Sequence, residues 1–406
     1  MLSQALILCG GLGTRLGDLT AATPKPMLPV AGRPFLDHLI QETARYGITR
    51  IVLLAGRFGA QIFAAYDGRE LYGARIEVLV EQTPLGTGGA LRFAQDRLDA
   101  EFLLLNGDSW IDADLVNFKG KWRIAKTAAP ELAVQMLLHT VPDAGRYGSV
   151  ALTDGRVSAF LEKSPERAGK PGLINAGVYL VTRDLVDTLP ADVACSLEAD
   201  VLPPLVAAGR VVAVSAPPGS YFIDIGIPET YARVQTELPR HRNRPAVFFD
   251  RDGTLNRDAG YTYRVEDLVW MPDAREAIAE ANEAGFFVFV VTNQAGVARG
   301  LYDEAAILAF HRTMQEQLAE IGGHIDALEW CPHHVDGTVE VYRKHCSRRK
   351  PGSGMIDDLL AAWPVDRARS LLIGDTEADM QAAAAAGIRA VRYEGGSLRQ
   401  LLQNSI

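Results

Sequence analysis

Short apolar runs alternate with amphipathic segments along the first half of the chain. Strands are predicted at residues 5–8, 50–55, 76–81 and 102–105. Helices are predicted where apolar residues recur every three or four positions, at residues 34–46, 61–66 and 88–98. This order indicates an α/β fold with a mostly parallel sheet and helices on both faces, and ligands bind such sheets beyond the carboxyl ends of the strands.

The pattern begins again in the middle of the chain. Ala246–Phe249 is a short apolar strand preceded by Pro245, and the polar, basic segment at 238–245 is expected to be a linker. Further helices are predicted at residues 274–284, 304–321, 354–363 and 378–386. The sequence therefore predicts two α/β domains, at residues 1–239 and 245–406.

Composition narrows the functional classes. The 406 residues are 48% apolar and carry a net charge of -9, so affinity for nucleic acid or anionic membranes is not expected. No apolar run reaches about 18 residues, and the N-terminus lacks the order of a signal peptide. The four cysteines are too scattered for a disulfide framework. We therefore expect a cytoplasmic protein, and the sequence is compatible with a homo-oligomer.

The first predicted strand runs into a glycine-rich loop. Gly10, Gly11 and Gly13 allow close approach of the backbone to a bulky anion, although a tight turn would also use them. Arg15 and Lys25 add the positive charge that a triphosphate needs. The loop lacks the Gly-Lys-Ser/Thr of a P-loop, and a Pro-rich stretch interrupts the helix expected of a dinucleotide fingerprint.

Two carboxylates at strand ends are candidate magnesium ligands. Asp108 follows the strand at 102–105, and an N-cap is the alternative role for it. Asp224 lies between β-branched residues, where an unpaired carboxylate is costly. A metal ion shared by both carboxylates would explain their positions.

Together these motifs resemble the sugar-1-phosphate nucleotidyltransferases over nearly all of residues 1–239. The motifs that carry the resemblance are Gly10-Gly-Leu-Gly-Thr-Arg15, Pro24-Lys-Pro-Met27, Leu85-Gly-Thr-Gly-Gly89, Asn106-Gly-Asp108, Glu162-Lys163, Asn175-Ala-Gly177 and Ile223-Asp-Ile-Gly226. Arg33-Pro-Phe-Leu36 and the Tyr-Phe-Ile-Asp-Ile-Gly-Ile-Pro-Glu-Thr-Tyr run that ends at Tyr231 are most similar to the heptose 1-phosphate guanylyltransferases of this family.

The resemblance implies a Rossmann-like three-layer domain that joins a sugar phosphate to GTP and releases pyrophosphate. Asp108 and Asp224 would hold Mg²⁺, while Arg15 and Lys25 would stabilise the charge that develops on the phosphates. Substrate would also contact Gly10, Gly11, Gly13, Gly86, Gly88, Glu162, Lys163 and Asn175. The preference for guanine rests on the resemblance alone.

The second domain carries acidic residues at several strand ends. Asp250 and Asp252 follow the strand at 246–249, and Asp375 lies in a Gly-Asp-x-x-x-Asp motif. Asp250 is suited to attack phosphorus, and Asp252 to protonate the leaving oxygen and then activate water. Thr292 and Lys350 would hold phosphate oxygens. A lone Asp-x-Asp-Gly could be a calcium loop or a turn, but these partners at these intervals favour phosphoryl chemistry.

This pattern resembles the haloacid-dehalogenase-like phosphatases over all of residues 245–406 and implies a second Rossmann-like three-layer fold. Mg²⁺ would be held by Asp250, Asp252 and Asp375. The runs Asn293-Gln-Ala-Gly296, Cys331-Pro-His-His334 and Arg349-Lys-Pro351 are similar to heptose 1,7-bisphosphate phosphatases. The resemblance implies that Asn293 and Arg349 help to place the substrate.

A structural zinc site is a further expectation from the same resemblance. The family commonly holds zinc with Cys-x-His and a later Cys-x-Cys, and Cys331, His333 and Cys346 match that pattern here. Arg348 stands where the last cysteine belongs, although structural zinc normally takes four nitrogen or sulfur ligands. His334 or His345 could substitute, and a loop without metal is the alternative.

The two resemblances describe consecutive steps. The phosphatase would remove the 7-phosphate of heptose 1,7-bisphosphate, and the transferase would join the resulting heptose 1-phosphate to GTP. One alternative keeps both domains but uses mannose 1-phosphate or another hexose, with GTP or dTTP, beside a histidinol-phosphate-like phosphatase. A further alternative makes one domain a docking module, which would predict the loss of catalytic carboxylates that are in fact present.

Overall fold

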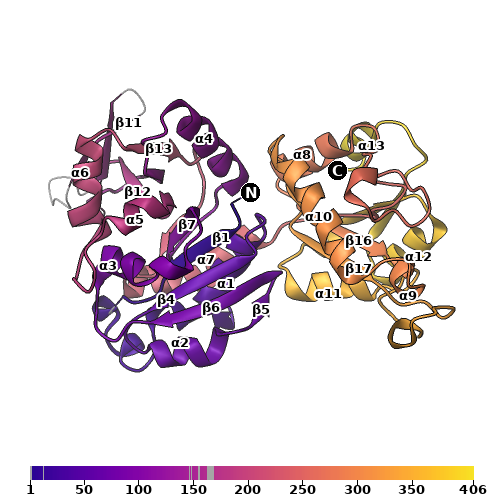
Figure 1. The fold of residues 1–406 in the computed structure, drawn as a ribbon, viewed down its shortest axis with the longest axis horizontal. Helices are drawn as coiled ribbons and strands as arrows, with labels where there is room; N and C mark the ends of the chain where they lie inside the picture. Colours follow the sequence, from indigo (N-terminus) through magenta and orange to yellow (C-terminus); the bar gives the residue numbers. More distant parts are fainter. Residues whose placement is uncertain (1, 12, 146, 148, 154–155, 162–168) are drawn as a thin grey trace. The chain divides into compact units, whose positions relative to one another are not determined.

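The computed structural model describes the whole chain apart from residues 1, 12, 146, 148, 154–155 and 162–168. The described chain forms two compact units (Figure 1). One comprises Met1–Ala44 and Ile48–Leu238, and the other comprises Pro239–Ile406 together with Arg45–Gly47.

The first unit is built on a sheet with the strand order β10-β11-β13-β9-β12-β7-β1-β4-β6-β5. Its strands are β1 (Gln4–Leu8), β4 (Arg50–Ala55), β5 (Glu70–Leu71), β6 (Ala74–Val80), β7 (Glu101–Asn106), β9 (Val134–Val141), β10 (Ser149–Thr153), β11 (Arg156–Leu161), β12 (Gly172–Thr182) and β13 (Val211–Ser215). The strands β7, β1, β4 and β6 are parallel, as the alternating pattern predicts. The sheet as a whole is mixed, because β12 runs antiparallel to both β7 and β9.

Two short pairs complete the strands of this unit, and helices connect and cover them. The pairs join β2 (Pro29–Val30) to β3 (Arg33–Pro34) and β8 (Ser109–Ile111) to β14 (Phe222–Asp224). The helices are α1 (Phe35–Ala44), α2 (Gly59–Tyr66), α3 (Gly86–Phe93), α4 (Leu115–Ala128), α5 (Arg183–Asp187), α6 (Leu202–Ala207) and α7 (Pro228–Arg242). The predicted helix at 88–98 is shorter than expected, because α3 ends at Phe93 and a 3-10 turn follows at Gln95–Arg97.

The segment expected to be a linker is partly helical. Helix α7 continues through Pro239 and ends at Arg242, which is buried. Arg240, His241 and Arg242 lie in its last turn, where positive side chains interact favourably with the helix dipole. The basic residues that suggested a solvated connector therefore serve in part to end a helix.

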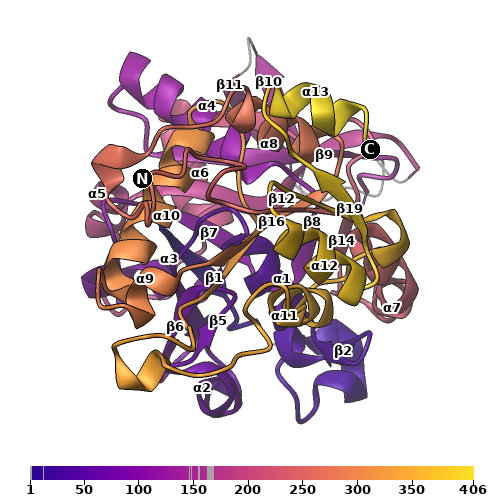
Figure 2. The same cartoon turned by 90° about the vertical axis from the view of Figure 1, so that its right-hand side faces the viewer.

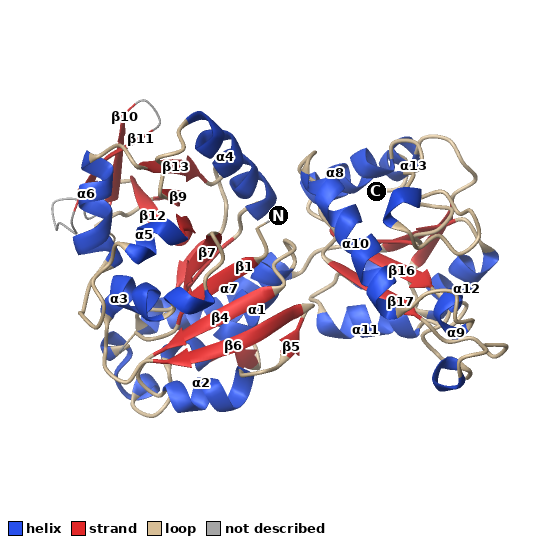
Figure 3. Cartoon of the chain, in the orientation of Figure 1, coloured by secondary structure: helices blue, strands red, loops and turns tan. Residues whose placement is uncertain are grey.

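The second unit contains a parallel sheet with the order β17-β16-β15-β18-β19. The strands are β15 (Ala246–Phe249), β16 (Phe287–Asn293), β17 (Ala327–Cys331), β18 (Leu371–Gly374) and β19 (Arg389–Arg392). The helices are α8 (Ala274–Glu283), α9 (Ala295–Ala298), α10 (Glu304–Ala319), α11 (Gly354–Ala362), α12 (Glu377–Ala385) and α13 (Leu398–Gln403). Figure 3 shows these helices around the strands of the sheet.

Each unit has its own apolar core. The core of the second unit combines the fully buried strand residues Val247, Phe249, Val288 and Val290 with apolar side chains of α8, α10 and α13. Strand β15 is buried at every position, which explains its continuous apolar sequence. Among the residues that the structure describes, no helix is both long and apolar enough to cross a bilayer.

Candidate active sites

Two strand ends bring Asp108 and Asp224 onto neighbouring backbone segments of the first unit. Asp108 follows β7, and Asp224 ends β14. Strand β14 pairs antiparallel with β8 (Figure 2), and in this pairing Asp224 lies opposite Ser109. The Ile225 N–H also donates to the Asp108 carbonyl oxygen at 2.9 Å. The fold therefore places the two predicted metal ligands beside each other.

The predicted cationic residues lie at the same place. Lys25 Nζ forms an ion pair with Asp108 Oδ2 at 2.5 Å, and its side chain is 7% exposed. A Cβ atom built on Gly226 would lie 2.6 Å from Asp224 Oδ1 and 3.2 Å from both Arg15 Nη2 and Lys25 Nζ. Glycine at this position therefore leaves room for two cations and two carboxylates to converge.

Tyr147 is a contact of this site that sequence reasoning missed. Its hydroxyl donates to Asp224 Oδ2 at 2.7 Å, and the Gly226 N–H donates to Asp224 Oδ1 at 2.9 Å. These two bonds fix the orientation of the Asp224 carboxylate. Tyr147 lies in the connection between β9 and β10, and no sequence motif indicates it.

The glycine-rich loop divides into structural and open positions. Gly10 lies against Gly56, since a Cβ on Gly56 would be 3.0 Å from Gly10 Cα. Gly13 has a φ of +65°, and its Cβ would lie 2.9 Å from a methyl group of Thr20. At Gly11, by contrast, nothing of the described chain lies within 4 Å of an added Cβ. Gly11 therefore has no packing reason to be glycine, which is the expectation for a site of ligand approach.

Gly86 and Gly88, which were predicted to contact substrate, have a packing role. A Cβ on Gly86 would lie 2.5 Å from the Cys195 carbonyl oxygen, and the N–H groups of Gly88 and Gly89 donate to the same oxygen at 2.8 and 3.2 Å. These N–H groups are already bonded within the protein. The glycines at the start of α3 therefore allow the segment around Cys195 to approach.

Of the three residues predicted to contact the sugar or its phosphate, the structure describes Asn175. Asn175 Oδ1 accepts from the Gly177 N–H at 3.0 Å, and Asn175 Nδ2 contacts the Tyr179 hydroxyl. A bulge in β12 between Asn175 and Tyr179 allows both interactions. The other predicted sugar contacts, Glu162 and Lys163, lie outside the described residues.

In the second unit, three adjacent strands deliver predicted site residues to one sheet edge. Asp250 and Asp252 follow β15, Thr292 lies at the end of β16, and Asp375 follows β18. Because β16, β15 and β18 are neighbours and parallel, their carboxyl ends meet. Gly253 has a φ of +91°, and its Cβ would lie 2.4 Å from Asp375 Oδ2, so this glycine permits the close approach of the two loops.

Lys350 is the cation of this cluster. Its Nζ forms ion pairs with Asp250 Oδ1 and, at 2.6 Å, with Asp379 Oδ1, and it donates to the Val291 carbonyl oxygen at 2.8 Å. The side chain of Lys350 is 4% exposed. A buried lysine that makes all three of its donor contacts is fixed in position and neutralises part of the negative charge.

Burial governs the protonation of this cluster. It raises the pKa of Asp250 to about 7, against the opposing effect of Lys350. Burial alone would lower the pKa of Lys350, but Asp250 and Asp379 outweigh it and the net direction is upward. Burial also raises the pKa of Asp375. The cluster therefore holds more carboxylate than one lysine neutralises, which suits a divalent cation.

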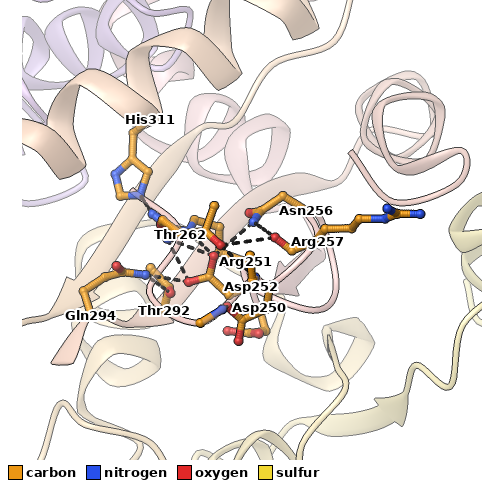
Figure 4. Close-up of polar contacts among 12 residues, drawn as sticks. Asp250, Arg251, Asp252, Asn256, Arg257, Thr262, Thr292, Gln294 and His311 are labelled. Atoms are coloured by element: carbon orange, nitrogen blue, oxygen red, sulfur yellow. Dashed lines mark hydrogen bonds and ion pairs between the residues drawn. The ribbon is translucent and has the colours of Figure 1, made fainter. Parts of the chain in front are cut away.

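Of the three magnesium ligands predicted in the second unit, two lie together in the structure. Oxygens of Asp250, Asp375 and Asp379 lie within 4.8 Å of one another, which fits a site for Mg²⁺. The carboxylate of Asp252 is not in that group. It accepts from Arg251, from Asn256 Nδ2 at 3.0 Å and from Gln294 Nε2 at 2.8 Å (Figure 4).

Three residues predicted to contact substrate, Thr292, Asn293 and Arg349, make hydrogen bonds within the protein. The side-chain amide of Asn293 bonds the backbone of Lys350 in both directions, each at 3.0 Å. Thr292 is buried, and its hydroxyl accepts from Gln294 at 2.8 Å. Asn293 thus positions Lys350. Arg349 Nη1 donates to the His333 carbonyl oxygen at 3.3 Å, which ties it to the neighbouring Cys/His loop.

The structure also brings Cys331, His333 and Cys346 together. Their ligand atoms lie within 4.8 Å of one another, and Cys331 Sγ is 3.7 Å from His333 Nδ1. Burial raises the pKa of Cys331 to about 11, so the thiol is protonated until a metal displaces its proton. Three donors of the right type fit zinc, and Arg348 is occupied by ion pairs with Glu329 and, at 3.1 Å, Asp358.

Some important residues carried no signal strong enough for sequence reasoning. Asp379 was visible only as the last residue of Gly-Asp-x-x-x-Asp, and it proves to be fully buried against Lys350. Arg251 stands between the two aspartates but is also fully buried. His311 comes from α10, which has no motif at all.

Comparison with known proteins agrees with this architecture. A model of the nucleotidyl transferase family matches residues 4–241, and a model of the HAD-hydrolase-like family matches residues 347–404. The first match covers more than half of the chain, which therefore belongs to the nucleotidyl transferase family. The second unit belongs to the HAD-like phosphatases, as its similarity to a curated member shows.

Three curated relatives define the similarity further. A D-glycero-beta-D-manno-heptose-1,7-bisphosphate 7-phosphatase of Rhodopseudomonas palustris is 51% identical over 152 residues, which are 37% of this chain and 84% of the relative. A D-glycero-alpha-D-manno-heptose 1-phosphate guanylyltransferase of Campylobacter jejuni is 33% identical over 228 residues, 56% of this chain and 96% of the relative. A mannose-1-phosphate guanylyltransferase of Mycobacterium tuberculosis is 35% identical over 239 residues, 58% of this chain and 65% of the relative.

Proposed function

We propose that this chain makes a GDP-heptose in two steps, first removing the 7-phosphate of D-glycero-D-manno-heptose 1,7-bisphosphate and then transferring GMP from GTP to the heptose 1-phosphate. The observation that carries this proposal is the presence, on one chain, of units similar to a heptose bisphosphate phosphatase and to a heptose 1-phosphate guanylyltransferase. The product of the first reaction is the substrate of the second.

In the phosphatase step, Asp250 supplies the nucleophile. A carboxylate oxygen of Asp250 attacks the 7-phosphorus, the bond from phosphorus to O7 breaks, and Asp252 gives a proton to the leaving oxygen. Water then attacks the aspartyl phosphate and passes a proton to Asp252, which frees phosphate and restores Asp250. Lys350 contacts Asp250 and would hold the charge of the phosphate. Mg²⁺ held by Asp250, Asp375 and Asp379 would neutralise the remaining charge.

In the transferase step, positioning supplies most of the catalysis. A 1-phosphate oxygen of the sugar attacks the α-phosphorus of GTP, and pyrophosphate leaves as the bond to the bridging oxygen breaks. Arg15 and Lys25 converge at Gly226 beside Asp224, where they can stabilise charge on the phosphates. Asp108 and Asp224 would hold Mg²⁺ there, and the open face of Gly11 would lie against the triphosphate.

The two activities require one anomer. The phosphatase relative is named for the β anomer, and the guanylyltransferase relative for the α anomer. Cleavage at the 7-phosphate leaves C1 untouched, so the anomer that enters the first reaction also enters the second. We therefore propose that this phosphatase acts on the α-1,7-bisphosphate.

One reaction mixture tests the proposal. The purified chain would be incubated with Mg²⁺, a single anomer of heptose 1,7-bisphosphate and equal amounts of GTP, ATP, UTP, CTP and dTTP, and the products identified by mass spectrometry. We expect a GDP-heptose from the α anomer. Heptose 1-phosphate without a nucleotide sugar would reject the transferase assignment. An unconsumed bisphosphate would reject the heptose substrate.

Mannose 1-phosphate is the second candidate substrate of the transferase, because the mannose-1-phosphate guanylyltransferase relative is 35% identical and the heptose relative 33% identical to this chain. Initial rates with mannose 1-phosphate and heptose 1-phosphate, each with GTP, separate the candidates. The heptose proposal expects a higher kcat/KM for the heptose 1-phosphate, and a higher value for mannose 1-phosphate would replace it.

A further inference from the structure

Arg251 stands between Asp250 and Asp252 in the sequence, and its side chain is fully buried. Its Nε donates to Asp252 Oδ1 at 3.0 Å, and its Nη2 lies 2.8 Å from both oxygens of the same carboxylate. A guanidinium offers a rigid fork of donors, so this contact restricts where the carboxylate points. Figure 4 shows the guanidinium beside Asp252.

The rest of the guanidinium is anchored away from the catalytic carboxylates. Nη2 donates to the Thr262 carbonyl oxygen at 2.6 Å, and Nη1 donates to His311 Nε2 at 3.1 Å. The charge also lies over the ring of Phe310, 4.6 Å from its centre. Each nitrogen of Arg251 therefore has a partner, and helix α10 supplies two of these contacts.

His311 can accept this bond only as a neutral ring, because arginine has no acceptor to offer and always donates. Burial, reinforced by Arg251, lowers the pKa of His311 well below its ordinary value. A neutral imidazole with its proton on Nδ1 leaves Nε2 free to accept from Arg251.

We propose that Arg251 is a positioning residue of the phosphatase, which directs the carboxylate of Asp252 toward the leaving oxygen. His311 in turn holds the guanidinium of Arg251 in place. This proposal rests on the phosphatase reaction proposed above but not on the identity of the sugar. Gln294 and Asn256 bond the same carboxylate from other directions, and Gln294 is itself held by Tyr302 at 2.8 Å. Asp252 is thus oriented from several sides, and among its described partners Arg251 alone carries a charge.

The test uses the leaving-group dependence of the full-length chain. Phenyl phosphate has a basic leaving oxygen that needs a proton from Asp252, whereas p-nitrophenyl phosphate has a good leaving group that does not. In Arg251→Met, we expect kcat/KM for phenyl phosphate to fall by about 100-fold, the scale of general acid catalysis, and kcat/KM for p-nitrophenyl phosphate to fall by less than about 10-fold. Equal losses with both substrates, or no loss, would overturn the proposal.

His311 provides a second test if Arg251→Met does not fold. His311→Leu removes the acceptor and should lower kcat/KM for phenyl phosphate selectively, while His311→Gln restores an acceptor and should recover most of it. Gln317→Leu is the matched control, since Gln317 lies on the same helix and accepts from Trp270 at 2.6 Å without touching Arg251. A loss in His311→Leu no more selective than in Gln317→Leu would overturn the role of His311.

The test is independent of the sugar assignment. Failure to consume any heptose 1,7-bisphosphate would reject the proposed substrate, yet the ratio of the two aryl phosphates would still report on Arg251. Conversely, an equal fall in kcat/KM for both aryl phosphates would reject the positioning role of Arg251, even if heptose 1,7-bisphosphate is the correct substrate.

Discussion

Lys350 is a residue whose removal should affect both the stability of the second unit and the proposed phosphatase reaction. It is the one cation in direct contact with the buried carboxylates of Asp250 and Asp379 among the described residues. Its place is fixed by Asn293, which bonds its backbone N–H and carbonyl groups. A charged residue with such contacts leaves uncompensated buried charge when it is removed.

Lys350→Met should therefore lose phosphatase activity and stability together. We expect kcat to fall by at least about 100-fold, and the free energy of unfolding of the second unit to fall by about 3–5 kcal/mol because the partner charges stay buried. Phosphate release and urea unfolding measure the two effects. Lys344→Met, which changes an exposed lysine nearby, is the control. A wild-type rate in Lys350→Met would show that Lys350 has no part in the reaction.

Gly11 allows a sharp test of the first site. No described atom lies within 4 Å of a Cβ added at Gly11, so Gly11→Ala should fold normally. If triphosphate lies against this position, the methyl group should raise KM for GTP by about 10-fold, or about 1.4 kcal/mol. Gly120→Ala is the matched control, because Gly120 is equally open and lies within α4. That change should leave KM unaltered and stabilise the helix by about 0.5–1 kcal/mol. An unchanged KM in Gly11→Ala would place the triphosphate elsewhere.

At the scale of the element, the ends of the predicted strands indicated which residues lie together at a sheet edge. The alternating pattern predicted β1, β4, β7 and β15, and the residues that follow β7, β15 and β18 lie at the expected sheet edges. The rule that ligands bind beyond the carboxyl ends depends only on chain direction, so sequence periodicity is enough to apply it.

Some contacts between elements could not be predicted from the sequence. Gly86 and Gly88 were predicted to contact substrate, and the structure adds a role that the sequence did not indicate, because the space beside both glycines is taken by Cys195, far along the chain. The bond from Arg251 to His311 likewise joins a loop to a helix without any local motif. The Asp252 carboxylate was expected to bind metal. In the structure its orientation is set by hydrogen bonds from Arg251, Asn256 and Gln294.

The candidate zinc ligands lie at the end of β17 and in the connection from β17 to α11. Three donors meet there, and Arg348 takes the place of a fourth. We expect Arg348→Cys to bind zinc with at least about 10-fold higher affinity than wild type, because a complete set of four nitrogen and sulfur ligands is the preferred structural site. Competition with a chelator, with zinc measured by mass spectrometry, gives the affinities.

Arg348→Ala is the control for that experiment, since it breaks the ion pairs with Glu329 and Asp358 without adding a ligand. An equal gain of zinc affinity in Arg348→Ala would mean that loss of the positive charge is responsible. Cys331→Ser should abolish zinc binding in either background, and retained binding would place the metal elsewhere.

At the scale of the whole molecule, the candidate catalytic groups form two sets. Each set lies within one compact unit: Asp108 and Asp224 in the first, and Asp250 and Asp375 in the second. The described contacts of each set are made within its own unit. Each activity should therefore survive loss of the other.

Two single-site variants test this independence. Asp250→Asn should lose phosphate release by at least about 1000-fold and keep transfer from GTP to heptose 1-phosphate, while Asp108→Asn should do the reverse. Loss of both activities in either variant would contradict independent units. Each variant also serves as the folding control for the other, since its remaining activity reports a native chain.

A mixture of the two variants then shows how the intermediate travels. If heptose 1-phosphate leaves one unit and enters the other through solution, Asp250→Asn and Asp108→Asn together should make nucleotide sugar from the bisphosphate after a lag. The lag should shorten as protein concentration rises, because free intermediate then reaches its working level sooner. If the mixture makes no product while each variant keeps its own activity, the intermediate must pass within a single chain. The fusion would then have a kinetic purpose beyond joint expression of two enzymes.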